Sequence, residues 1–181
     1  GQMAGFRRAM TYSVKEAYYT LQGEGAQTGR AAVFLRFAGC NLWSGLERDR
    51  ASAVCTFCDT DFVGVNGPGG GKFADADKLV DHVAAMWVGE KGRRYVVCTG
   101  GEPLLQLDEM LIEAFHTRGF EVGVETNGTI AAPESLDWIC VSPKAASDLK
   151  QLSGDELKLV YPQAEAQPER FAHLNFRNFF L

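Results

Sequence analysis

The stretch 94-RYVVCTGGEPLLQL-107 decides the fold, because an apolar run passes through two glycines into a helical pattern. Residues 94–98 predict a short buried strand. Apolar residues then recur at helical spacing from Leu104 to Phe115, with Pro103 suited to the first helical turn and Gly119 to the end of the helix. The sequence therefore predicts a strand, a tight turn and a helix, in that order.

The same alternation of strand and helix extends to both sides of this stretch. A second helical pattern runs from Leu79 to Trp87, and Asp75 or Asp77 precedes it as a candidate N-cap. Alternating strands and helices indicate parallel βαβ units, in which ligands bind beyond the carboxyl ends of the strands. Further strands are predicted at residues 32–37, 120–124, 138–141, 157–161 and 178–181, a short helix at 168–173, and an irregular, glycine-rich loop at 66–72.

The composition of the chain is that of an ordinary globular protein. It has 181 residues, of which 46% are hydrophobic and 23% charged, and these values suit one domain with a sizeable core. The formal net charge of −5 and the lack of a dense Lys/Arg tract argue against a nucleic-acid partner. The sequence also lacks a run of about 18 apolar residues, the length that predicts a membrane span. Five cysteines at uneven spacing do not suit a disulfide framework, so we expect the reducing cytoplasm.

We expect a single domain that comprises residues 10–181. Residues 1–9 read as an extension, with Met10 as a natural start and without a secretory signal. Residues 178–181 are apolar and strand-like, which is an unusual way for a chain to stop. We therefore expect a further C-terminal segment in the natural protein.

Three cysteines follow the predicted strand at residues 32–37 and have the spacing of a metal site. Fourteen residues separate Cys40 from Cys55, and Cys58 completes a C-x2-C pair. A structural zinc site uses four protein ligands, whereas three thiolates suit a 4Fe–4S cluster that keeps one iron open to a small molecule. The three cysteines therefore indicate a catalytic site and not a purely structural one. Structural zinc is the alternative if the C-x2-C pair is considered alone. Cys98 and Cys140 lie inside strand patterns and are expected to be buried small hydrophobic residues.

An aromatic residue directly before the last cysteine, Phe57, and three later motifs complete a family pattern. These motifs are TGGEP at 99–103, ETNG at 125–128 and VSPK at 141–144, and each begins where a predicted strand ends. In this order they resemble the radical S-adenosylmethionine enzymes. The usual cysteine spacing of that superfamily is C-x3-C-x2-C, and the fourteen-residue gap departs from it.

The start of the chain resembles one family within this superfamily. YTLQGEG at 19–25, Arg36 and CDT at 58–60 are similar to the 7-carboxy-7-deazaguanine synthases, and the resemblance covers residues 10–181. It implies an α/β fold, a partial (β/α) barrel with mainly parallel strands. It implies a lyase of queuosine biosynthesis that converts 6-carboxy-5,6,7,8-tetrahydropterin to 7-carboxy-7-deazaguanine by radical ring contraction with loss of ammonia. It also implies a 4Fe–4S cluster, S-adenosylmethionine as a catalytic cofactor, Mg2+, a one-electron donor such as flavodoxin, and a homodimer.

The resemblance also carries roles onto residues of this sequence. Arg36 interrupts an apolar strand and must find an anion, and the resemblance gives it the carboxylate of the substrate. The cluster ligands would be Cys40, Cys55 and Cys58, and a Mg2+ ligand would be Thr60, without a further catalytic side chain. S-adenosylmethionine would contact Phe57, Cys58, Asp59, Gly101, Glu125, Asn127, Ser142, Pro143 and Lys144, and the pterin would contact Leu21, Gln22, Gly23, Glu24, Arg36 and Thr99.

Two functions of other classes stay open at this point. A glycyl-radical-enzyme activase would share the cluster but act on a protein glycine, and it would need no pterin pocket at residues 21–24 and Arg36. A zinc-binding interaction module would need a fourth ligand and would be colourless.

Overall fold

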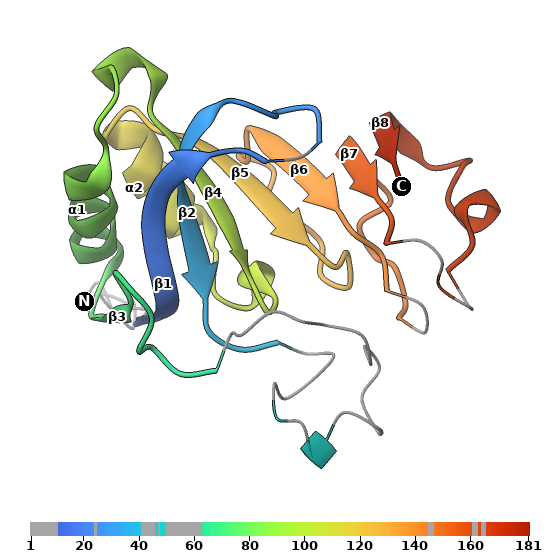
Figure 1. The fold of residues 1–181 in the computed structure, drawn as a ribbon, viewed down its shortest axis with the longest axis horizontal. Coiled ribbons are helices and arrows are strands. Elements are labelled where there is room, and N and C mark those ends of the chain that lie inside the picture. Colours follow the sequence, from blue (N-terminus) through green and yellow to red (C-terminus); the bar gives the residue numbers. More distant parts are fainter. Residues whose placement is uncertain are drawn as a thin grey trace, which may run out of the picture.

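The structure, a computed structural model, describes residues 11–23, 25–40, 46, 48–49, 63–144, 147–160, 163 and 166–181. These residues form one sheet of eight strands in the order β3-β1-β2-β4-β5-β6-β7-β8 (Figure 1). The strands are β1 (Tyr12–Leu21), β2 (Ala31–Phe37), β3 (Gly71–Phe73), β4 (Tyr95–Gly100), β5 (Glu121–Thr126), β6 (Trp138–Val141), β7 (Ser153–Lys158) and β8 (Asn175–Phe180).

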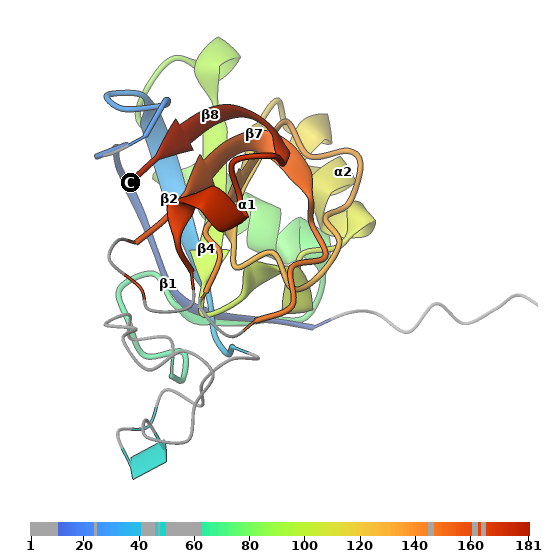
Figure 2. The same cartoon turned by 90° about the vertical axis from the view of Figure 1, so that its right-hand side faces the viewer.

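The sheet is mainly parallel, as predicted. β2 and β4 to β8 pair in parallel, and β1 and β3 join one edge as antiparallel strands. Figure 2 shows that the sheet is curved. Because β2, β4, β5 and β6 pair in parallel, their carboxyl ends lie at one edge of the sheet. This arrangement confirms the expected partial (β/α) barrel.

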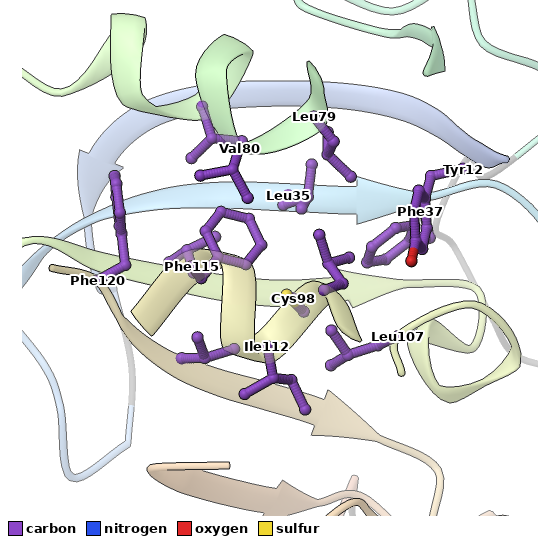
Figure 3. Packing of buried hydrophobic residues seen from close by; sticks show 14 of the residues in the cluster. Tyr12, Leu35, Phe37, Leu79, Val80, Cys98, Leu107, Ile112, Phe115 and Phe120 are labelled. Carbon is purple, nitrogen blue, oxygen red and sulfur yellow. The ribbon is translucent and has the colours of Figure 1, made fainter. Parts of the chain in front are cut away.

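Two helices cover one face of the sheet and form the main core with it. They are α1 (Ala76–Met86) and α2 (Glu109–Thr117), and both lie on the same side of β1, β2, β4 and β5 (Figure 1). Leu79 from α1 and Phe115 from α2 reach Leu35 and Cys98 in the sheet (Figure 3), and all four are fully buried. Burial raises the pKa of the Cys98 thiol well above its usual range, so this cysteine is a core residue, as predicted.

Side-chain caps decide where the two helices begin. Asp75 accepts a hydrogen bond from the backbone N–H of Lys78 and starts α1, which confirms one of the two predicted caps. The helix predicted from Pro103 is in fact interrupted. Pro103–Leu105 forms a single 3-10 turn, and α2 begins only after Asp108, whose carboxylate caps the N–H of Leu111 at 2.9 Å. This second cap restarts the helix, and the predicted start is therefore wrong.

Other predictions of secondary structure also need correction. The helix predicted at residues 168–173 is a single 3-10 turn, Pro168–Arg170, and the last strand, β8, begins at Asn175 instead of residue 178. The first strand, β1, was not expected, because polar and charged residues interrupt its apolar pattern. Gly71 and Lys72, expected in a loop, begin the three-residue strand β3, which pairs with β1. β7 lies earlier than the predicted strand at residues 157–161, because two carboxylates in its sequence SGDELK disguise a buried strand.

In the part of the chain that the structure describes, every helix is too short or too polar to cross a lipid bilayer.

Candidate functional site

Three polar side chains meet at the carboxyl ends of neighbouring strands. Arg36 of β2 lies in register with Thr99 of β4, and Glu125 follows on β5. The Thr99 hydroxyl lies 3.5 Å from the Glu125 carboxylate. These three residues separate two adjoining cavities of about 360 and 320 Å3, which we call the inner and the outer cavity. The structure thus brings together residues that the sequence placed in two different binding roles.

The outer cavity lies beyond the ends of β4, β5 and β6. It contains most of the residues that the sequence predicted for S-adenosylmethionine. Its lining consists of Arg36, Thr99, Gly100, Gly101, Glu125, Thr126, Asn127, Cys140, Ser142, Lys144 and Lys158.

The end of β4 and the start of the cysteine segment are in close contact at Gly101. A β-carbon at Gly101 would overlap the carbonyl oxygen of Gly39 and lie 2.6 Å from the β-carbon of Cys40. The backbone N–H of Glu102 donates to the same Gly39 carbonyl at 2.9 Å. Only glycine therefore lets β4 end against Cys40, which is partly exposed beside the outer cavity.

Glu102 lies beneath this edge, and its carboxylate joins the segment that follows β4 to the end of β5. Its carboxylate is fully buried and accepts hydrogen bonds from the backbone N–H groups of Leu104 (2.9 Å) and Asn127 (2.8 Å) and from the Thr126 hydroxyl (2.8 Å). Burial raises the pKa of the Glu102 carboxyl, while these hydrogen bonds act in the opposite direction. Glu102 therefore fixes the ends of β4 and β5 from below and does not line either cavity.

Replacing Glu102 by alanine should destabilise the protein by about 3 kcal/mol, because two buried N–H groups and one hydroxyl would lose their acceptor. Chemical denaturation of the purified variant measures the change. Glu109→Ala is the matched control: this carboxylate is exposed at the start of α2, and its loss should change stability by less than about 0.5 kcal/mol. Equal stabilities for the two variants would contradict the role of Glu102.

The loops after β5 and β6 complete the outer cavity. The Asn127 side-chain oxygen accepts from the backbone N–H and the hydroxyl of Thr129, so that oxygen shapes the turn. The backbone N–H of Ser142 donates to the Thr126 carbonyl at 2.8 Å, which joins the two loops. Lys144 lies 3.4 Å from the Ser142 hydroxyl and supplies a positive charge, and Pro143 is buried between them.

The inner cavity extends from Arg36 to the turn between β1 and β2. Gln22 and Gly23 form its far wall, with Tyr18 and Phe34 at the side. Gln22 is buried and held by backbone hydrogen bonds to Arg30 and Gly29. The structure thus places Gln22 and Gly23 opposite Arg36 and Thr99, as a shared pocket requires. Leu21, the last residue of β1, is 61% exposed and lines neither cavity.

Arg36 has an ionic partner that the sequence analysis missed. Its Nε donates to the Glu16 carboxylate at 3.0 Å across the β1–β2 pair, where the two residues lie directly opposite. Both side chains are largely buried. Arg36 lines both cavities, and its bond to Glu16 uses only Nε of the guanidinium. An oppositely charged residue in the neighbouring strand is the signal for such a partner, but β1 itself was not predicted.

Of the three predicted cluster ligands, Cys40 is the one that lies among the described residues. Cys55 and Cys58, together with Phe57, Asp59, Thr60 and Glu24, lie outside the described residues. Among the described residues, His, Cys, Asp and Glu form no group of three that could hold a metal ion. Cys140 is buried and lines the outer cavity, and burial raises the pKa of its thiol.

The segment that begins at residue 63 is bound to β1 by hydrogen bonds. Lys15 donates from Nζ to the Val63 carbonyl (2.8 Å) and to the Asn66 side chain (2.7 Å). The backbone N–H of Ala17 donates to the Pro68 carbonyl at 2.9 Å. Both ends of the cysteine segment are therefore attached to the sheet: Cys40 lies against the end of β4, and Val63 is bound by β1.

Comparison with known proteins gives one consistent family. The model of the Radical SAM superfamily matches residues 50–155, more than half of the chain. The 7-carboxy-7-deazaguanine synthase of Caulobacter vibrioides is 66% identical over 172 residues, which cover 95% of this chain and 82% of the relative. The 7-carboxy-7-deazaguanine synthase of Bordetella pertussis shows the same identity and coverage.

A solved structure supports the fold independently. The crystal structure of QueE from Escherichia coli superposes with a TM-score of 0.69 and covers 94% of this chain and 83% of that chain, at 24% sequence identity. The curved sheet and its helices are thus a known arrangement.

Proposed function

The chain belongs to the 7-carboxy-7-deazaguanine synthase family of radical S-adenosylmethionine enzymes, and we infer that it catalyses the reaction of that family. It is a lyase that converts 6-carboxy-5,6,7,8-tetrahydropterin to 7-carboxy-7-deazaguanine, with ring contraction and loss of ammonia, in deazapurine biosynthesis. Its cofactors are a 4Fe–4S cluster and S-adenosylmethionine. The family assignment favours this function over a glycyl-radical-enzyme activase and over a zinc-binding module.

The outer cavity suits S-adenosylmethionine. Gly101 lines this cavity, and because it has no side chain the end of β4 lies directly against Gly39 and Cys40, which places the cavity next to the first predicted cluster ligand. Glu125 and Ser142 can bind hydroxyl groups, and Lys144 can bind a carboxylate. Asn127 and Pro143 would shape the cavity, while Phe57 and Asp59 would contribute from beside Cys58. When bound, the cluster and S-adenosylmethionine together supply a radical that abstracts a hydrogen atom from the substrate.

The inner cavity suits the pterin. Arg36 would bind the substrate carboxylate with its two terminal nitrogens, because Glu16 already occupies Nε. Gln22, Gly23 and the neighbouring Glu24 would bind the aminopyrimidine edge at the far wall, whereas Leu21 lines neither cavity and is given no role in this proposal. Thr99 lies between the two cavities and would face the reacting carbon from β4. These residues would hold one face of the substrate toward the outer cavity and exclude water from it.

The single observation that supports this assignment is the position of Arg36, Thr99 and Glu125 on the boundary of both cavities. Two ligands that must react with each other would meet there. The direct test is an anaerobic assay of the reconstituted protein with the tetrahydropterin, S-adenosylmethionine and a chemical reductant. We expect 7-carboxy-7-deazaguanine as the product, and cleavage of S-adenosylmethionine without it would contradict the proposed substrate.

We propose Thr60 as a ligand of Mg2+, a hard ion that prefers oxygen. Thr60→Ala should leave cluster content and S-adenosylmethionine affinity within about twofold of the unaltered protein and should weaken the stimulation of turnover by Mg2+. A titration of activity with Mg2+ measures this effect. Thr117→Ala is a control that removes an exposed threonine from the end of α2. If both variants respond to Mg2+ as the unaltered protein does, Thr60 is not the ligand.

The partners of the enzyme follow from the same proposal. A one-electron donor such as flavodoxin would reduce the cluster, and two copies of the chain would form a homodimer in the cytoplasm. Neither nucleic acid nor a membrane is part of the proposed reaction.

A further inference from the structure

The turn between β1 and β2 is partly exposed, with only Gln22 buried among its described residues, but a hydrogen bond holds it against β7. Figure 1 shows it reaching across toward β6 and β7. The described part of this turn comprises residues 22–23 and 25–30. It lies at the amino ends of the parallel strands, opposite to the outer cavity, and its first residues form the far wall of the inner cavity. Whatever holds this turn in place therefore also sets the depth of the inner cavity.

A buried carboxylate on β7 provides one attachment. Glu156 is only 4% exposed, and its Oε2 accepts a hydrogen bond from the backbone N–H of Ala26 at 3.0 Å. The same residue lies beside Cys140 of β6 in the sheet register. A buried carboxylate needs hydrogen bonds to offset its loss of hydration, and the turn supplies one of them.

The turn is shaped to receive this carboxylate. Gly25 has a backbone φ of +78°, a conformation that favours glycine, and a β-carbon there would overlap the Glu156 carboxylate. Gly25 is therefore required twice, by its backbone conformation and by the carboxylate that lies against it.

Little empty space remains between the turn and the strands. A cavity of only about 10 Å3 lies among Gln22, Gln27, Glu125 and Glu156. A second attachment comes from Arg30, whose guanidinium lies 3.8 Å from the centre of the Tyr95 ring and pairs with Glu121 at 2.7 Å. The turn is thus held to the sheet at two places, by the buried Glu156 and by the more exposed Arg30.

We propose that Glu156 is a positioning residue for substrate recognition, which holds the β1–β2 turn through Ala26 and Gly25 and so places Gln22 and Gly23 against the pterin. This inference rests on the proposed function, because the inner cavity is there assigned to the substrate. Glu156 itself does not line the inner cavity, and its effect on the substrate passes through the turn.

The test compares Glu156→Ala with a matched control on the same strand. Asp155→Ala removes the neighbouring carboxylate, which also accepts a backbone N–H, that of Ile139 at 2.9 Å, but does not touch the turn. Binding of the tetrahydropterin to the anaerobic, cluster-loaded protein is measured by calorimetry. Amide hydrogen exchange of the turn is measured on the same proteins without substrate.

Glu156→Ala should weaken pterin binding roughly tenfold to a hundredfold, as loss of a hydrogen bond to a charged group does, and should accelerate exchange at the turn. Its affinity for S-adenosylmethionine should stay within about twofold. Glu156→Gln, whose amide oxygen can still accept from Ala26, should restore most of the pterin affinity. Asp155→Ala should lower the melting temperature yet leave pterin affinity and turn exchange unchanged.

Gly25→Ala tests the same contact from the turn and does not depend on the folding of Glu156→Ala. It should weaken pterin binding while sparing S-adenosylmethionine. Unchanged exchange at the turn in Glu156→Ala would overturn the attachment. Faster exchange with unchanged pterin affinity would overturn the link to the substrate. The proposed function fails separately, if the unaltered protein binds the pterin but forms no deazapurine.

Discussion

Replacing Cys40 or Cys55 by alanine should leave the protein without a 4Fe–4S cluster and should reduce product formation below detection. Three thiolates are the minimum set that can hold such a cluster with one iron open, so the loss of one removes the site. Anaerobic reconstitution followed by iron and sulfide analysis and by the absorbance of the brown chromophore measures cluster content. Stoichiometric zinc in the unaltered protein, with no uptake of iron, would contradict the cluster altogether.

Cys98, a cysteine of the core, provides the matched control. Cys98 is fully buried between the sheet and the two helices, on the side of β4 away from the cavities. Cys98→Ser should therefore retain the cluster, although the buried hydroxyl should cost about 1–3 kcal/mol of stability. Loss of iron in this variant at a temperature where it is folded would mean that the ligand set is wrong.

Replacing Arg36 by alanine should lower product formation about 30-fold to several thousand-fold, because the substrate carboxylate would lose its charged partner in a largely buried position. The cluster and slow cleavage of S-adenosylmethionine without substrate should persist. The measurement follows 5′-deoxyadenosine and the deazapurine side by side. Arg118→Ala is the control, since it removes an arginine from an exposed ion pair with Asp81.

Two further variants test the same pterin-binding site. Glu16→Gln removes the charge that holds Arg36 at Nε, and it should reduce pterin affinity less than the loss of Arg36 itself. Glu24→Gln keeps the size of its side chain but turns one acceptor into a donor, and it should also lose most ring contraction. Product formation at the unaltered rate in both Arg36→Ala and Glu24→Gln would place the pterin elsewhere.

The strands that the sequence predicted best are those with short, predominantly apolar runs. β4 is buried along almost its whole length, and β2, β5 and β6 each carry buried apolar residues, which makes these strands recognisable in the sequence. The motifs at their carboxyl ends then follow from topology alone, because parallel strands bring those ends to one edge. For this reason Arg36, Thr99, Gly101 and Glu125 could be expected near one another.

The strands that the sequence did not predict correctly, β1 and β7, contain charged residues that the fold buries wholly or in part. β1 carries Lys15 and Glu16 in its middle, and β7 carries Asp155 and Glu156, so neither resembles a core strand. Each charge has a partner distant in sequence: Lys15 binds residues 63 and 66, and Glu16 binds Arg36. Such pairs form only after the sheet register is set, and no local pattern encodes them.

Glu102 illustrates the same limit of local patterns within a predicted motif. The sequence placed it in a turn next to the cofactor, but its partners Thr126 and Asn127 lie 24 and 25 residues further along the chain. The structure therefore turns its carboxylate beneath the site, where it organises the loops.

The contact between the β1–β2 turn and β7 limits the order in which the chain can fold during its synthesis on the ribosome. Ala26 and Glu156 lie 130 residues apart in the chain. At about 5–20 residues per second, a ribosome needs about 7–26 s to synthesise the intervening segment. Throughout that interval the nascent hairpin has no β7 carboxylate to receive its turn, and until β4 has emerged β2 also lacks its parallel neighbour. The turn can therefore attach to β7 only late in synthesis, and until then the hairpin stays accessible on the polysome to other nascent chains and to chaperones.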